Sequence, residues 1–415
     1  MSKNMKTNIA FILLLLCIWF SSAEEVKERD YSFTVYDGSL NLFTMQQFNE
    51  GYTSIHRMTM RALADVLGDK NINGAKLSDL LSFIPSFIFI PFTHEEGHRS
   101  IAVHLGYGAF SNPFFDLTGR AFSKIEISKE YPISYFRRIL SAGIESDYLM
   151  CRNDTLSAFY LFEDLNICFY DFFPRSLINN NYLLSSFIVG KVFENNEYVK
   201  KIFAYSGNIR DYAGYDPISF TAALFHEDVG YFYEEYSDIS DEEKVFLDRI
   251  AFRSLINYIN PFMIGTPSIK ISDVFSFSVF MNYSLCPFGD FIEETAAVKY
   301  NNINADIYIR QYQNKDFWFP SFGIGLTDFR IHSFSFDAAF HFWMQPEDLS
   351  FISSVGKPGC AGEVKLTWFI PNSKDFPIKS TGISLGVSGK TKGFLPGYES
   401  HENDIRLSAG FTIRY

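Results

Sequence analysis

The chain has 415 residues, a formal net charge of −12 and an aromatic content of 18%. The negative charge and the lack of a basic run argue against nucleic acid as a partner, because phosphate binding depends on clustered Lys and Arg. The length allows two or three domains. The aromatic residues, with 46 Phe and 24 Tyr, exceed what a soluble core needs and are typical of lipid-facing aromatic girdles.

The N-terminus predicts export. Lys3 and Lys6 precede an apolar run over 9–20, and small residues follow up to Ala23. A basic start, a short apolar stretch and a small-residue cleavage site describe a secretory signal peptide. The run is also shorter than the about 20 residues that a membrane-spanning helix needs. We therefore predict a signal peptide over 1–23 and an exported mature chain.

The mature chain keeps four cysteines, Cys151, Cys168, Cys286 and Cys360. An even number permits disulfides in an oxidising compartment. None of them forms a C-x-x-C pair, which excludes a cysteine-rich zinc site. Cys151 and Cys168 are the nearest in sequence and the favoured pair, with two free buried thiols as the equal alternative.

The middle of the chain predicts helices. Segment 54–68 carries apolar residues at three- and four-residue spacing and ends at Gly68, which is typical of an amphipathic helix. Segment 241–259 begins with acidic residues, which stabilise a helix N-terminus, and continues as an apolar stripe. We predict a mainly helical domain over 24–265.

The C-terminal part predicts strands. In the last segment Ile405, Leu407 and Phe411 fall on one face, and Arg406 falls on the other. This alternation has a period of two residues, as in a β-strand. The final residue is Tyr415, and the segment resembles the closing strand of bacterial outer-membrane β-barrels. The same alternation recurs over 275–283, 303–310, 334–342, 363–370 and 383–388.

Two architectures explain this alternation. A secreted β-sandwich with one buried face gives the same period, so periodicity alone does not decide. The aromatic content, the signal peptide and Tyr415 favour a small antiparallel outer-membrane β-barrel over 266–415. With segment 319–329 counted as well, about seven strands are evident there, and bacterial barrels have an even number of at least 8. Segment 30–38 is the candidate for the missing strand, and it would bring the mature N-terminus back to close the barrel.

The stretch "HEEGH" carries the chemistry. His94 and His98 are four residues apart, so on a helix both imidazoles point to one side and can share a tetrahedral metal. Glu95 then reaches the metal-bound water as a general base. The alternative is an ordinary helix surface. Gly97 argues against that alternative, because glycine costs about 1 kcal/mol inside a helix, and it indicates close approach of another segment or a substrate.

With Ala102 added, the stretch resembles the HExGHxxxA helix of the zincin metallopeptidases. The gluzincin branch of that family takes its third zinc ligand from a glutamate on a later helix. The resemblance assigns this role to Glu145 in "SAGIESDYL". Family members often carry an orienting aspartate four residues later, where this chain has Leu149. Asp147 is only two residues from Glu145 and would face away from it on a helix.

Together, "HEEGHR", "AGIESDYL" and "RDYAGYDPISFTAALF" resemble segments of uncharacterised bacterial outer-membrane-type proteins. The resemblance implies an α+β fold, with a helical zincin-like domain followed by a small antiparallel outer-membrane barrel of about 8 strands. It supports the pairing of the HEEGH motif with Glu145 and names no substrate. We predict that His94, His98 and Glu145 hold zinc and that Glu95 is the catalytic base of a metallopeptidase. The partners would be outer-membrane lipid and a peptide or protein substrate.

Alternatives remain open for location and function. The exported protein is periplasmic or secreted if the strands form a sandwich. In the alternative function it is a non-enzymatic outer-membrane β-barrel protein, whose HEEGH helix is structural or binds metal without turnover. His226 stands beside Glu227 and is a weaker candidate ligand, for which an exposed loop is the favoured interpretation. A site-two-type intramembrane protease would need several spanning helices and a second motif of Asn-Pro-Asp type, and neither is present.

Overall fold

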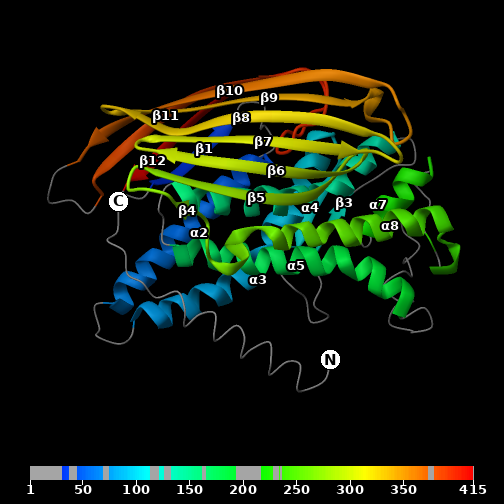
Figure 1. Cartoon of the computed structure of the whole chain (residues 1–415), viewed down its shortest axis with the longest axis horizontal. Helices are drawn as coiled ribbons and strands as arrows, with labels where there is room; N and C mark the ends of the chain where they lie inside the picture. The colour runs from blue at the N-terminus through cyan, green and yellow to red at the C-terminus, as the bar shows by residue number, and fades with distance from the viewer. Residues whose placement is uncertain are drawn as a thin grey trace.

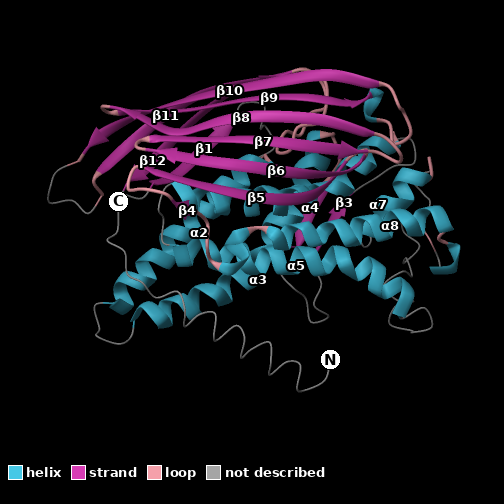
Figure 2. Ribbon diagram, viewed as in Figure 1, coloured by secondary structure: helices cyan, strands magenta, loops and turns pink. Residues whose placement is uncertain are grey.

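The computed structural model has two layers, a large antiparallel sheet and a group of helices that covers one of its faces (Figure 1, Figure 2). The predicted signal peptide over 1–23 and Tyr415 lie outside the described residues. The structure describes residues 30–36, 44–68, 74–112, 121–125, 132–160, 165–192, 216–227, 233, 236–372 and 378–414.

The predicted helical content of the middle of the chain is confirmed. Helix α2 ends at Gly68, as its apolar spacing indicated. Helix α8 begins with a capping box, in which the Ser240 side chain accepts from the Glu243 backbone N–H and Glu243 accepts from the Ser240 backbone N–H. Among the described residues, no helix has the length and apolarity to cross a membrane. The helices are α2 (Met45–Gly68), α3 (Gly74–His104), α4 (Ile133–Tyr160), α5 (Leu165–Val192), α7 (Asp216–Phe225) and α8 (Asp241–Ser254).

The C-terminal strands and the N-terminal strand β1 (Asp30–Tyr36) form one sheet with ten members in the order β1-β12-β11-β10-β9-β8-β7-β6-β5-β4. All neighbouring strands are antiparallel. The other nine strands of this sheet are β4 (Ile269–Lys270), β5 (Phe275–Cys286), β6 (Gly289–Tyr300), β7 (Ile303–Gln313), β8 (Trp318–Ile331), β9 (Phe334–Pro346), β10 (Gly356–Pro371), β11 (Ser380–Lys390) and β12 (Asp404–Arg414).

The N-terminal strand joins the sheet as predicted, but it does not close a barrel. Strand β1 (Asp30–Tyr36) pairs with β12 from Asp30 opposite Arg414 to Tyr36 opposite Ser408. Among the described residues β1 and β4 remain the two edges, so the expected closed barrel of about 8 strands is corrected to an open sheet of ten. The physical reason is that helices occupy the edge: the Ser54 hydroxyl of α2 donates to the Ser32 carbonyl of β1.

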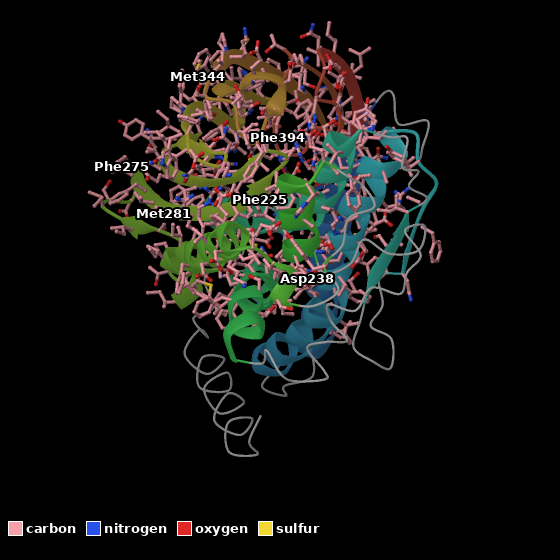
Figure 3. All side chains as sticks on the ribbon, turned by 90° about the vertical axis from the view of Figure 1, so that its right-hand side faces the viewer. Phe225, Asp238, Phe275, Met281, Met344 and Phe394 are labelled. Atoms are coloured by element: carbon pink, nitrogen blue, oxygen red, sulfur yellow. The ribbon has the colours of Figure 1, made fainter. Side chains whose placement is uncertain are left out.

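The two parts of the chain share one core. One buried cluster combines Ile101 of α3 and Leu140 of α4 with Leu285 of β5. Seen end on, the sheet arches over the helices, and Phe394 from the loop between β11 and β12 lies beneath the arch (Figure 3). Position 265 therefore separates a mainly helical sequence from a β sequence, while the two layers pack as one body.

The close approach expected at Gly97 occurs between α3 and α4. A Cβ atom at Gly97 would lie 2.6 Å from the Ala142 carbonyl oxygen, which leaves no room for any other residue. The missing side chain lets the two helix backbones cross in contact. This crossing brings the middle of α4 directly beneath the histidines of α3.

The described cysteines are free thiols. Cys151 and Cys168 lie in the same buried cluster as Phe172 and Phe262, without a bond between them. The second alternative, two free buried thiols, therefore holds for this pair.

Candidate metal centre

His94 and His98 lie on one side of α3, and each ring is held through Nδ1. The Nδ1 of His94 lies 2.8 Å from the Asp147 Oδ2, and the Nδ1 of His98 lies 2.7 Å from the Ile139 carbonyl oxygen. A carboxylate and a carbonyl accept hydrogen bonds, so both rings carry their proton on Nδ1. In the neutral rings, the Nε2 atoms then present lone pairs, which is the state of a metal ligand.

Asp216, the first residue of α7, completes the cluster. Its Oδ2 lies 3.0 Å from the His94 Nε2 and 3.2 Å from the His98 Nε2, and the two Nε2 atoms are 3.3 Å apart. Tetrahedral zinc with bonds of about 2.0–2.1 Å separates its ligand atoms by about 3.3 Å. The donor set and its spacing therefore fit one zinc ion.

The three lone pairs also need a cation between them. Two neutral imidazole nitrogens and a carboxylate oxygen repel one another when no hydrogen or metal lies between them. Gly143 of α4 faces the same point, because a Cβ atom there would lie 2.5 Å from both Nε2 atoms. The fold thus keeps side chains of α4 out of the place where the three ligand atoms converge.

Asp147 orients His94, and Arg175 of α5 holds Asp147. The Arg175 guanidinium lies 3.1 Å from the Asp147 Oδ1, while the Oδ2 of the same carboxylate contacts His94. Arg175 is fully buried. Asp147 faces away from Glu145 on α4, as expected, and its carboxylate therefore points toward His94. An orienting carboxylate behind a ligand histidine is a common feature of metal sites.

Glu145 is not the third member of the cluster. Both of its carboxylate oxygens contact the Arg138 guanidinium, and one of them accepts from the Gly397 backbone N–H at 2.7 Å. The assignment of Glu145 as a zinc ligand is corrected on this geometry. On α4, Glu145 points to the loop between β11 and β12, and Asp216 is the acidic residue that lies beside the two histidines.

Tyr182 of α5 positions Asp216. Its hydroxyl oxygen accepts from the Asp216 backbone N–H at 3.0 Å, and its ring meets the His94 ring edge to face at a centroid distance of 5.9 Å. The hydroxyl therefore fixes the first residue of α7 while the ring supports the first ligand histidine.

Glu95 is buried beside the cluster. Its Oε2 accepts from the Ser123 hydroxyl at 2.7 Å, and Ser123 belongs to β3 (Phe122–Ile125), which pairs with β2 (Ala109–Asn112) next to α3. Burial raises the pKa of Glu95, although His94 and His98 oppose that rise. A carboxylate with a raised pKa suits a general base, because it both takes and returns a proton near neutral pH.

The opposite charges of the cluster stabilise one another, which raises the pKa values of the histidines and lowers the pKa of Asp216. Burial disfavours the imidazolium forms, but Asp147 and Asp216 outweigh it at His94, and Asp216 outweighs it at His98, so both histidine pKa values are raised. Burial likewise disfavours the charged carboxylate of Asp216, but the two histidines outweigh it and lower the Asp216 pKa well below its usual range. In the metal-free protein the two aspartates therefore favour the protonated forms of the histidines.

We expect opposite pH trends for the metal-free and the zinc-loaded protein. Without metal, the raised histidine pKa values contribute stability that is fully present below about pH 6.5 and is lost as the pH rises through the raised values. Zinc requires neutral imidazoles, so its stabilising effect grows over the same range. Melting temperatures of dialysed and zinc-loaded protein between about pH 5.5 and 8.5 would test this. A zinc-induced shift that does not change with pH would contradict it.

The weaker candidate His226 lies away from the cluster. Its Nε2 lies 2.7 Å from the Glu243 Oε1 on the first turn of α8, where it supports the start of that helix. The residue that sequence reasoning missed is Asp216, although it stands within the quoted segment "RDYAGYDPISFTAALF". An aspartate followed by proline at a helix start was the available signal, because proline is favoured in the first turn.

Comparisons with known proteins assign no family. No family model matches the chain, and no curated protein matches it. Among solved structures, the crystal structure of Acinetobacter baumannii OccAB3 aligns with a TM-score of 0.27 and 12% sequence identity. The alignment covers 36% of this chain and 46% of that chain. A likeness of this extent carries no argument about function, so the cluster must be interpreted from its own geometry.

Proposed function

We propose that this chain is a zinc-dependent hydrolase that cleaves peptide bonds. In this proposal His94, His98 and Asp216 hold the ion, and Glu95 is the general base. The observation that carries it is the convergence of the three ligand atoms, separated by 3.0, 3.2 and 3.3 Å, with both histidine Nδ1 atoms already engaged. Such a set takes up either a proton or a metal cation, and its spacing suits zinc.

The number of ligands favours a catalytic site. The group found among the described residues has three members, and three protein ligands leave the fourth position of tetrahedral zinc for water or substrate. Zinc in such a site lowers the pKa of a bound water to about 7 and polarises a substrate carbonyl. Glu95 accepts the proton of the attacking water on its carboxylate and returns it to the leaving amine. The Ser123 hydroxyl orients that carboxylate.

We also propose that the protein is exported and acts at the bacterial outer membrane. The predicted signal peptide over 1–23 supports export, and the apolar side chains on the exposed face of the sheet support contact with a membrane. The peptide or protein substrate would then be one that reaches this membrane.

A non-enzymatic role is the second candidate, and the depth of the cluster favours it. The side chains of His94, His98 and Asp216 are 14%, 3% and 5% exposed. A metal ion enclosed to this extent can stabilise the fold, and a structural role does not require a substrate to reach the ion. In that case the HEEGH helix is structural, or it binds metal without catalysis.

Glu95→Gln separates the two candidates. We expect the variant to keep its zinc and to lose about 10²–10⁴-fold in the rate of peptide hydrolysis, which is what a general base contributes. Fluorescein-labelled casein and a mixture of quenched fluorescent peptides would be the substrates. Glu96→Gln is the matched control, because Glu96 contacts Arg99 and Ser111 instead of the cluster. Wild-type protein that binds zinc but cleaves none of these substrates would contradict the enzyme and leave the structural role.

A further inference from the structure

The exposed face of the ten-stranded sheet is apolar, whereas the covered face carries the charged side chains of the strands beside buried aromatic residues such as Phe280, Tyr312 and Trp343. In a soluble protein the face of a sheet that is left open is polar. We infer that the exposed face lies against the hydrocarbon of a lipid bilayer, a conclusion that does not depend on the metal centre. Exposed apolar residues of its strands include Val279, Ile307, Ile309, Phe322, Ile324, Phe340, Val364, Leu366, Trp368, Ile383, Leu385, Val387, Ile405, Leu407 and Phe411.

The charges of the same strands face the helices. Glu293 of β6 is fully buried and contacts Arg152 of α4 at 2.9 Å, and Arg310 of β7 contacts the other oxygen of that carboxylate at 2.6 Å. Asp306 of β7 contacts Arg152 as well. These pairs fix which face meets the helices. The sheet therefore cannot pack on the helices through its other, apolar face without breaking these ion pairs.

Few charged side chains lie on the exposed face of the sheet, as contact with hydrocarbon requires. Val364 of β10 pairs with Val387 of β11 on the exposed face, whereas the next position, Lys365, forms an ion pair with Asp337. The exposed charged residue Glu294 lies in the middle of β6, opposite Ile309, and its carboxylate accepts from the Gln311 side-chain amide at 3.2 Å. Most of the exposed face is apolar, which suits acyl chains because charge in hydrocarbon is costly.

The strands are long enough for a bilayer. Strands β5 to β12 contain between 11 and 16 residues, and a membrane-crossing strand needs about 9–11. Trp318 begins β8 and Trp368 lies near the end of β10, on opposite ends of the sheet. Aromatic residues at both ends of an apolar band are typical of the two membrane interfaces.

Side chains of the helical layer bond to the backbone of one residue on each side of the sheet. Ser54 bonds to both the N–H and the carbonyl of Ser32 on β1. On the other side, the Asn257 amide accepts from the Tyr283 N–H at 2.6 Å and donates to the Tyr283 carbonyl of β5 at 3.4 Å. Open sheet edges are not tolerated in lipid. These helix-borne side chains give the open sheet partners at positions where a closed barrel would have a further strand.

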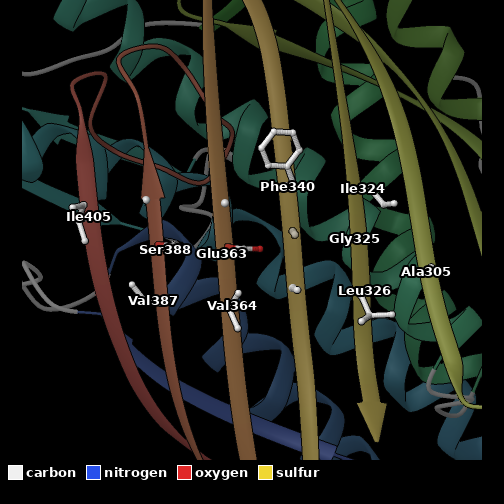
Figure 4. A pocket seen from close by; sticks show the side chains of 14 residues that line it. Ala305, Ile324, Gly325, Leu326, Phe340, Glu363, Val364, Val387, Ser388 and Ile405 are labelled. Carbon is white, nitrogen blue, oxygen red and sulfur yellow. The ribbon is translucent and has the colours of Figure 1, made fainter.

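A hollow lies in the middle of the exposed face (Figure 4). Its volume is about 700 Å³, and small residues such as Ala305, Ala338 and Gly362 form its floor between Phe340 and Val364. The hollow is mostly apolar, with Glu363 and Ser388 as its polar lining residues, and a mainly apolar hollow of this size accommodates hydrocarbon. The hollow therefore fits acyl chains better than a soluble partner.

Tryptophan quenching in brominated vesicles tests the inference. Full-length variants that keep only Trp318, Trp343 or Trp368 would be reconstituted into phosphatidylcholine vesicles with or without bromine on the acyl chains. Trp368 is 49% exposed and Trp343 is 1% exposed, whereas Trp318 is 47% exposed with the Arg253 guanidinium of α8 over its ring at 4.7 Å. We expect loss of most emission for Trp368, a smaller loss for Trp318 and little loss for the Trp343 control.

A charge substitution gives a second readout. Leu385 on the sheet and Val245 on α8 are 66% and 68% exposed, so they form a matched pair. We expect Leu385→Arg to stop the protein from floating with vesicles and Val245→Arg to leave flotation unchanged. Unquenched Trp368 in a folded protein would overturn the inference. If Trp368 were unquenched and the protein formed a concentration-dependent dimer, the exposed face would instead be the contact with a second copy of the chain.

Discussion

Asp216→Ala is expected to abolish tight zinc binding while the fold is kept. The substitution removes one of three ligand atoms and leaves two imidazoles, which also lose the carboxylate that balances the charge of the ion. The loss should exceed the about 10–100-fold that follows removal of an orienting partner such as Asp147. Competition with a zinc-binding dye would measure the affinity.

The matched control is Asp241→Ala. Asp241 is also the first residue of a helix, α8, but it is exposed and lies outside the cluster. We expect this variant to bind zinc as the wild type does. Glu145→Gln should also keep its zinc, because Glu145 contacts Arg138. If Glu145→Gln lost zinc and Asp216→Ala kept it, the third ligand proposed here would be wrong.

Arg138→Met is expected to lower the free energy of unfolding by about 3–5 kcal/mol, the usual result of leaving one partner of a buried ion pair. The side chains of Arg138 and Glu145 are 1% and 0% exposed. The Arg138 guanidinium also donates to the Tyr398 carbonyl at 3.1 Å, so the pair joins α4 to the loop between β11 and β12. Denaturant unfolding at neutral pH would measure the change.

Two further variants separate charge from packing in that result. Arg137→Met is the control, because the Arg137 guanidinium donates to the Ala223 carbonyl and its removal leaves no buried carboxylate alone. The double variant Arg138→Met with Glu145→Leu should recover most of the lost stability, since an apolar pair replaces buried ions at little cost. A loss below about 1 kcal/mol for Arg138→Met would mean that water reaches Glu145.

The fold was predictable where local periodicity determines it. The alternation over 363–370 and 383–388 identified β10 and β11, and the apolar spacing over 54–68 identified α2. Whether the sheet closes into a barrel was not predictable from the sequence, because that depends on where the helices pack. The contact between Ser54 and Ser32 that covers one edge joins segments whose local patterns are independent of each other.

The candidate site was predictable only within α3. His94, Glu95 and His98 share a helix, so their mutual placement follows from helix geometry. Asp216 is 118 residues beyond His98, and the packing of α7 brings it to the cluster. Helix geometry correctly turned Asp147 away from Glu145. Which of these two acids faces the histidines depends on the crossing at Gly97, which fixes the rotation of α4.

X-ray absorption at the zinc edge is the measurement that tests the metal centre most directly. Purified protein would be loaded with zinc and dialysed, and the bound metal and its ligands would be determined together. We predict one zinc per chain with two imidazole nitrogens and oxygen ligands at about 2.0–2.2 Å. Folded protein that retains no zinc, or zinc bound through sulfur, would contradict the assignment of His94, His98 and Asp216.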